Sequence, residues 1–262
     1  PMQDSSSDAQ KDEQAINAFK PTVHHKDWTS IVKSSKGKIT SPILVKSKAN
    51  AEALSKVNKI AIIAFNVSDW RGSDDMLNEF YDVLKQSFEK NGFSVLSANE
   101  IVNNEYYNNF QLEENNMRKL TGATNKYLQP FKQAYGLRPF YGGAIIEGMY
   151  KNTTKNLKTM QELAQALQVD AVLVVELNFT VKVGGKATIL FSRGSNLNGM
   201  IIDMFYAGEP DEIWSGAVVE NEKWKTEVKK KDSVDALAPY IKQYIEKYGE
   251  LAARNMLINA KQ

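Results

Sequence analysis

The 262-residue sequence contains no cysteine. This absence excludes disulfide bonds, thiol nucleophiles and thiolate metal ligands, and it leaves the redox compartment open because a cysteine-free chain is compatible with either. Histidine is also scarce, since His24 and His25 are the only two. Adjacent side chains rarely face one centre, so we expect no metal site, no histidine-based catalytic triad and no cofactor.

Long apolar runs and an excess of charge are missing as well. No run approaches the ~20 apolar residues that a membrane-spanning helix needs, and no short apolar region precedes a small-residue cleavage site within this sequence. Lys and Arg number 33 against 31 Asp and Glu, so we expect no general attraction to nucleic acid. The chain starts with Pro1 and Met2, which leads us to expect that an upstream segment has been removed.

The composition, 42% hydrophobic and 24% charged, is typical of a globular protein. Residues 1–57 are polar and are predicted to form a flexible tether and a lead-in. Residues 58–262 are predicted to form a single α/β domain. A polar and aromatic stretch at about 103–150 has no clean period and is interpreted as a partly helical insertion.

The start of the predicted domain has the pattern strand, helix, strand. Residues 59–65, KIAIIAF, lack polar alternation and are typical of a strand covered on both faces. The helix that follows Ser73 has apolar residues at three-to-four spacing and ends at Asn91-Gly92. Residues 93–97, FSVLS, form the next predicted strand, parallel to the first.

The second half predicts a helix, a meander and a final helix. Thr159 and Glu162 fit a capping box, unless the helix begins earlier, near Thr153, in which case the match is a coincidence. One long strand is predicted from Asp170 to Val183, followed by antiparallel strands. The fold class is therefore α/β with α+β character: a central mixed sheet of about five strands and a long C-terminal helix.

The loop after the first strand, NVSDWRGSDD, contains a single glycine. A dinucleotide or phosphate loop needs several glycines or a Lys-Ser/Thr pair there. Ser73, Asp74 and Asp75 are instead typical of a helix N-terminus, where the carboxylates would repel a phosphate. We therefore predict helix capping and no phosphate site.

Aromatic residues are the candidates for binding a protein partner. Trp70 and Arg71 lie on a strand-to-helix loop, where α/β proteins expose their binding edge, although Trp70 could equally fold back onto the core. Phe140 and Tyr141 in the insertion are assigned the same role. For catalysis, the paired-carboxylate candidates are Asp170, Glu176 and Asp203. Such residues more often cap, pair or face water, and we assign no catalytic residue.

Several phrases resemble the bacterial envelope lipoproteins related to CsgG, LpoB and PelC, which carry a TolB N-terminal-like α/β domain. The phrases are KIAIIAF, LKQSFEKNGFSVLSANEI, LAQALQVDAVLVVEL and IIDMFYAGEPDEIWSG. The resemblance implies a periplasmic protein that is anchored in the outer membrane through a lipidated cysteine upstream of this chain. It also implies a non-catalytic domain, so no catalytic residues are carried over.

Three functions stay open at this point. The preferred one is a non-catalytic periplasmic lipoprotein that binds envelope protein partners or assembles with itself. The first alternative is a ring-forming secretion or export subunit, for which NFTVKVGGKATILF supplies a hairpin. The second alternative is a carboxylate-dependent hydrolase of envelope glycans.

Overall fold

A computed structural model describes about three fifths of the chain, and the account below concerns this part alone. The described residues are 43–67, 70, 72–113, 133–138, 153–178, 181–183, 186–188, 198–220, 224–225 and 234–261. Among these described residues, no helix combines the length and apolar character needed to cross a membrane.

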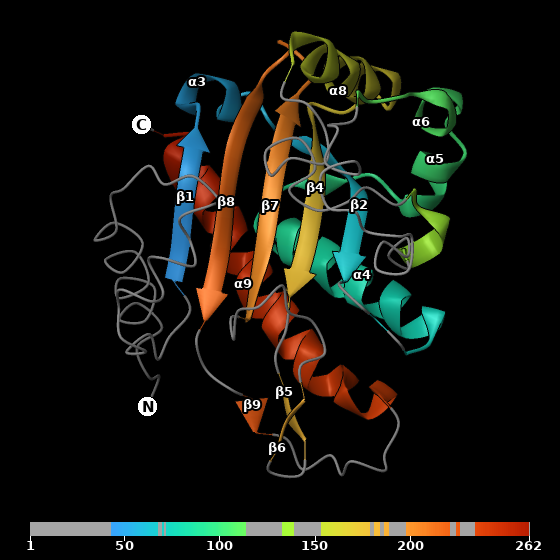
Figure 1. Cartoon of the computed structure of the whole chain (residues 1–262). Helices are drawn as coiled ribbons and strands as arrows, with labels where there is room; N and C mark the ends of the chain where they lie inside the picture. Colours follow the sequence, from blue (N-terminus) through green and yellow to red (C-terminus); the bar gives the residue numbers. More distant parts are fainter. Residues whose placement is uncertain are drawn as a thin grey trace.

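A six-stranded mixed sheet forms the centre of the molecule, in the order β1-β8-β7-β4-β2-β3 (Figure 1). β2 is parallel to both β3 and β4, whereas β4, β7, β8 and β1 are antiparallel to one another. This confirms the predicted α/β class and mixed sheet. The strands are β1 (Ile43–Ala49), β2 (Lys59–Val67), β3 (Ser94–Val95), β4 (Ala171–Asn178), β7 (Asn198–Tyr206) and β8 (Glu212–Glu220).

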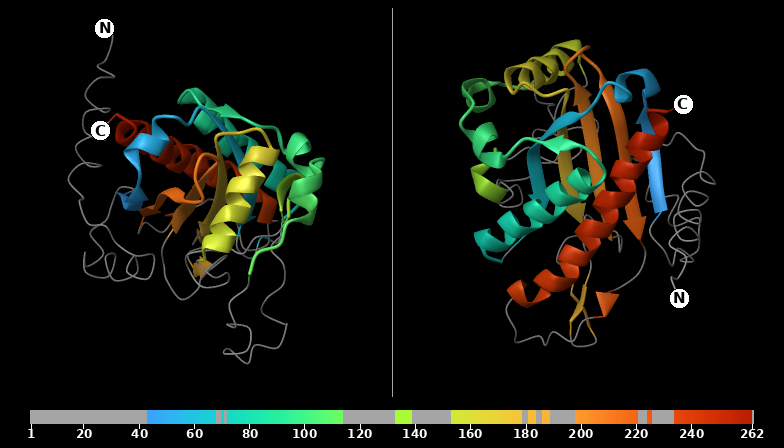
Figure 2. Two further views of the ribbon diagram at one scale, coloured as in Figure 1. Left: turned by 90° about the horizontal axis from the view of Figure 1, so that it is seen from above. Right: turned by 180° about the vertical axis from the view of Figure 1, so that it is seen from behind.

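Helices cover both faces of this sheet. α4 (Asp74–Lys90) and α9 (Ala238–Asn259) lie against one face, and α8 (Thr154–Ala166) lies against the other (Figure 2). Short elements complete the described part: α3 (Ala51–Leu54), α5 (Ala98–Val102), α6 (Glu105–Asn109), the 3-10 turns η2 (Ala134–Gly136) and η3 (Val234–Leu237), and a small sheet of β5 (Val181–Val183), β6 (Lys186–Thr188) and β9 (Trp224–Lys225).

The first strand and helix of the domain, β2 and α4, form where the sequence pattern predicted them. β2 is buried along nearly its whole length, as a central strand without polar alternation must be. Ser73 caps α4 by accepting a hydrogen bond from the Met76 N–H at 3.3 Å. Asp74 and Asp75 occupy the first turn, where carboxylates complement the helix dipole. The predicted capping is confirmed.

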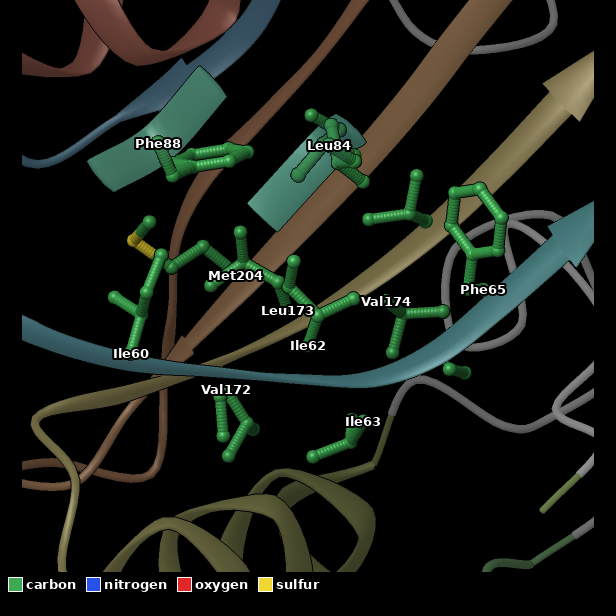
Figure 3. Close-up of a cluster of buried hydrophobic side chains, with 14 of the residues drawn as sticks. Ile60, Ile62, Ile63, Phe65, Leu84, Phe88, Val172, Leu173, Val174 and Met204 are labelled. Carbon is green, nitrogen blue, oxygen red and sulfur yellow. The ribbon is translucent and has the colours of Figure 1, made fainter. Parts of the chain in front are cut away.

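The core lies between the sheet and its helices. On one side, Ile60, Ile62 and Leu173 meet Leu84 and Phe88 of α4, and on the other side Ile63 and Val172 point toward α8 (Figure 3). Each of these seven side chains is fully buried. Burial of apolar area on both faces is the main contribution to the stability of such a layered domain.

Three sequence predictions need correction. β1 lies inside the segment predicted to be a tether and lead-in, yet it pairs with β8 and makes the sixth strand. The long predicted strand is divided, because β4 ends at Asn178 and Val181–Val183 belong to the small sheet. α8 begins with Thr153 as its N-cap, so the Thr159–Glu162 match is a coincidence.

α4 and α9 approach each other closely at Gly249. A Cβ atom at this position would lie 2.9 Å from Leu84 Cδ1 and 2.9 Å from Ser87 Cβ, closer than van der Waals contact. Gly249 therefore sets the distance between the two helices.

We predict that Gly249→Ala lowers the free energy of unfolding by about 1 kcal/mol or more, because overpacking outweighs the gain in helix propensity. Urea denaturation measures the change. Lys247→Ala, at an exposed position of the same helix, is the control and should change stability little. A more stable Gly249→Ala variant would contradict the close approach.

Candidate functional site

Trp70 is a core residue in this structure. Its side chain is 5% exposed, its Nε1–H donates to the Ser73 carbonyl at 3.0 Å, and its ring packs edge-on against Phe80. A Cβ atom at Gly72 would collide with this ring, so the glycine allows the indole to fold back. Trp70 therefore folds back onto the core, the second of its two predicted placements, and is not exposed on a binding edge. Arg71, Phe140, Tyr141, His24 and His25 lie outside the described residues.

The three candidate carboxylates do not converge on one point. Asp170 holds the start of the sheet together, because its Oδ2 accepts hydrogen bonds from the backbone N–H groups of Asn58 and Lys59 at 2.9 and 2.8 Å. Glu176 on β4 and Asp203 on β7 lie on the same face of the sheet as diagonal neighbours. Both are buried. Asp170 is structural, and the other two share a face of the sheet.

Asp203 pairs with Glu212, a residue that the sequence reasoning did not single out. The register of β7 and β8 places Asp203 opposite Ser215 and Phe205 opposite Glu212, so the two acids share a face. The Ser215 hydroxyl donates to Asp203 Oδ1 at 2.8 Å. We call Asp203 and Glu212 the carboxyl pair.

The environment of Glu212 favours its protonated form. Burial raises the pKa of Glu212 well above its usual range, and the neighbouring Asp203 carboxyl raises this pKa further. Lys48 acts in the opposite direction, but its ammonium group binds Asp211 at 2.6 Å. Burial and the neighbouring carboxyl thus both favour the neutral form of Glu212. A neutral carboxyl group can donate a hydrogen bond, which an ionised one cannot.

We predict that stability declines with rising pH because of Glu212. A carboxyl whose folded pKa is raised stabilises the fold at low pH, and this contribution is lost as pH rises from the unfolded value of ~4.3 through the folded pKa, by at most ~1.4 kcal/mol per pH unit. Glu212→Gln keeps a donor to Asp203 and cannot ionise, so its unfolding free energy should decline less between pH 5 and pH 9.

The control for this prediction is Glu209→Gln, which removes the same formal charge from the exposed turn before β8. It should keep the decline seen in the wild type. Urea denaturation at several pH values gives the slopes. A Glu212→Gln variant with the slope of the wild type would contradict the raised pKa of Glu212.

A second group of functional candidates lies along the outer edge of β2. β3 pairs only with Lys59 and Ile60, so the remainder of this edge has no long neighbouring strand among the described residues. Residues 133–138, the one described piece of the insertion beyond Glu113, lie against the edge instead. An isolated antiparallel bridge pairs Gln133 with Asn66. We call residues 133–138 the edge strap.

Side chains of the edge strap and of α6 satisfy the backbone of β2. Gln133 Oε1 accepts from the Phe65 N–H at 3.2 Å, and Gln133 Nε2 donates to Asn66 Oδ1. The Tyr107 hydroxyl donates to the Ile63 carbonyl at 2.8 Å. These side chains bond to backbone groups of β2 that a neighbouring strand would otherwise pair with. They thereby cover an edge that, if open, could pair with another chain.

Arg138 fastens the other end of the edge strap. Its backbone N–H donates to the Tyr107 hydroxyl at 2.7 Å, and its Nη1 donates to the carbonyls of Tyr107 and Phe110 at 2.7 and 3.0 Å. The guanidinium also stacks 4.3 Å from the centre of the Phe110 ring. Leu137 is buried beside it. The segment is therefore held by specific bonds at both ends.

Tyr135 occupies the middle of the edge strap in a left-handed conformation, with φ 52° and ψ 23°. Asn78 Oδ1 accepts from its backbone N–H at 2.8 Å, and its hydroxyl donates to Asp82 Oδ2 at 2.6 Å. Burial and the Asp82 carboxylate raise the pKa of Tyr135 to about 12. Its ring packs edge-on against Tyr81 and is 40% exposed, the one large hydrophobic side chain exposed among the described residues.

Comparisons with known proteins give structural likeness only. No family model and no curated protein matches the chain. A PelC dodecamer from Paraburkholderia phytofirmans matches at 9% identity and TM-score 0.35, over 80% of this chain and 96% of that one. The LpoB C-terminal domain from Salmonella enterica matches at 15% identity and TM-score 0.32, over 66% of this chain and 96% of that one. Lipoprotein GNA1162 from Neisseria meningitidis matches at 14% identity and TM-score 0.30, over 73% of this chain and 95% of that one.

These scores are too low to establish a common fold. Within the described residues, no group of three or more acidic or histidine side chains is arranged to hold a metal ion. The features that stand out on the described surface and in the described core are therefore the edge strap and the carboxyl pair. The sequence contains one signal for the edge strap, the glycine at position 136, because glycine readily adopts the positive φ that a tight turn requires. In the structure Gly136 has φ 72°.

We predict that Tyr135→Gly is more stable than Tyr135→Ala by about 1 kcal/mol, because only glycine adopts positive φ without a steric cost. Both variants lose the aromatic ring and the hydroxyl, so their difference isolates the backbone. Urea denaturation gives both free energies. An alanine variant as stable as the glycine variant would show that Tyr135 does not adopt this conformation.

Proposed function

We propose that the chain is a non-catalytic protein of the bacterial envelope that binds, or assembles with, other envelope proteins. The observation that carries the binding role is Tyr135, an exposed aromatic ring held on a rigid turn. Tyrosine is enriched among residues that dominate binding energy at interfaces, because it offers a large contact area at low entropic cost. The envelope location is supported by the resemblance of the sequence phrases quoted above.

The geometry of the edge strap supports a preorganised contact. Asn78 and Asp82 fix the backbone and the hydroxyl of Tyr135, so a partner would meet an aromatic side chain that is already immobilised. Gln133 and Arg138 anchor the turn on both sides. A binding residue on such a support loses little conformational freedom when a partner docks.

Hydrolysis of envelope glycans is a second candidate, favoured by the carboxyl pair alone. A protonated Glu212 beside Asp203 has the acid and base components that such a reaction uses. We rank it second because both carboxyls are buried, and because Asp203 already accepts a hydrogen bond from Ser215. The ring-forming subunit is a third candidate, for which the described β5–β6 hairpin provides only a short element.

The binding role is tested by replacing Tyr135 with a photoreactive phenylalanine in the full-length protein, in its own host. We predict crosslinks to a protein in the envelope fraction, because Tyr135 faces the partner. The same substitution at Lys247, exposed on α9, is the control and should give none. Equal crosslinking from both positions, or none from Tyr135, would contradict the proposal.

A further inference from the structure

The exposed ring of Tyr135 lies against one side of α4. Asp75, Asn78 and Asp82 follow one another along this helix at three- and four-residue spacing, so their side chains point to the same side. We call these three residues the α4 stripe. Asn78 and Asp82 hold Tyr135 by its backbone N–H and its hydroxyl, at 2.8 and 2.6 Å. Asp75 continues the stripe toward the start of the helix and is exposed.

The N-terminal part of α4 is acidic. Residues 74–84 contain no Lys or Arg, and their carboxylates are those of Asp74, Asp75, Glu79 and Asp82. Lys242 of α9 binds Glu79 and offsets one of these charges. The chain as a whole has 33 Lys and Arg against 31 Asp and Glu. The negative charge is therefore a local feature of this helix and not a property of the whole protein.

Negative charge also acts directly at the Tyr135 side chain. Burial raises the pKa of its hydroxyl, and the carboxylates of Asp82 and Glu79 raise this pKa further, to about 12. The hydroxyl therefore stays protonated at neutral pH and keeps its bond to Asp82. An aromatic ring has a negative face. The ring and the carboxylates thus attract the same kind of ligand, a cation.

Other kinds of partner fit this surface less well. Tyr135 is the one large hydrophobic side chain exposed among the described residues, whereas the buried centre of a specific interface is normally apolar. An apolar partner would therefore have little to cover here. The carboxylates of α4 would repel an anionic partner. A cationic segment fits, because its charge meets the carboxylates and a Lys or Arg side chain can lie over the ring.

We propose that Tyr135 and the α4 stripe bind a segment rich in Lys or Arg on another envelope protein. This inference rests on the proposed function and names the chemistry of the partner. One cation of the segment lies over the exposed ring, and its neighbours pair with Asp75 and Asp82. Two hydrogen bonds already hold Tyr135, so the ring loses little conformational freedom when the segment docks.

The first test uses a hexa-arginine peptide as the probe and a hexaglutamate peptide as its control. NMR titration of the whole chain follows the backbone amide signals of Tyr135 and Asn78. We expect hexa-arginine to shift both signals and hexaglutamate to leave them unchanged. Raising the ionic strength from ~0.01 M to ~0.1 M shortens the Debye length from ~30 Å to ~10 Å and should weaken hexa-arginine binding by ~tenfold. Unshifted signals, or equal shifts from both peptides, would overturn the inference.

Two variants locate the binding on this surface. Asp75→Asn keeps the size of the side chain and removes its charge, and it should weaken hexa-arginine binding by ~threefold, the size expected of one exposed ion pair. Glu209→Gln removes the same charge from the exposed turn before β8 and should leave the affinity unchanged. Tyr135→Asn removes the ring, tolerates the left-handed backbone and should also weaken binding. Equal affinities in Asp75→Asn and Glu209→Gln would overturn the inference.

Crosslinking in the host separates this inference from the proposed function. With the photoreactive residue at position 135, Asp75→Asn in the same chain should lower capture of the envelope partner by ~threefold. Glu209→Gln should not lower it. Capture that does not change in Asp75→Asn would overturn the cationic partner and leave the proposed function standing. Absence of any capture from position 135 would overturn both.

Discussion

The outer edge of β2 imposes the constraint on which this side of the molecule depends. β2 is buried along nearly its whole length, and β3 accompanies it for only two residues. The backbone groups beyond Ile60 still require hydrogen bonds, because an unpaired buried N–H or C=O is costly. Tyr107 and Gln133 supply them from a helix and from the edge strap. Loss of these side chains would leave an edge open to pairing with another chain.

The same solution produces the candidate binding surface. Directly after Gln133 the chain turns sharply, and Tyr135 adopts a left-handed conformation in this turn. Asn78 and Asp82 of α4 offset the cost by binding Tyr135 on both sides. An unusual backbone is therefore coupled to an exposed aromatic ring, a combination that often accompanies function. The polar groups of the carboxyl pair, by contrast, are buried against the sheet.

Sequence patterns predicted the elements with strong local signals. The apolar run of β2, the Ser73 cap and the Asn91-Gly92 stop each depend on neighbours in the sequence, and each is present. β1 was missed because its place in the sheet comes from pairing with β8, far along the chain.

The candidate site was less predictable, for the same reason. Glu212 stands beside Asp203 only through strand register, and the role of Gln133 depends on the uncovered edge of β2. Phe140 and Tyr141, the aromatic residues named in the insertion, lie outside the described residues, and the exposed ring in the described part of the insertion is Tyr135. Of the residues named in advance, Trp70 is buried and Asp170 holds backbone groups. Long-range pairing, which no local pattern encodes, decides the cases of Glu212, Gln133 and Asp170. Trp70 folds back through local contacts with Ser73 and Phe80.

Hydrogen exchange at the Phe65 amide tests the central claim most directly. This N–H points to the outer edge and is bound by the Gln133 side chain. In the wild type we predict slow exchange of this amide under native conditions. In Gln133→Ala we predict that the Phe65 amide exchanges faster by ~tenfold or more, as expected for loss of a hydrogen bond worth roughly 1.5 kcal/mol. The backbone N–H of the next residue, Asn66, points to the opposite side of the strand, toward β4, and should keep its protection. Unchanged protection of Phe65 in the variant would contradict the account.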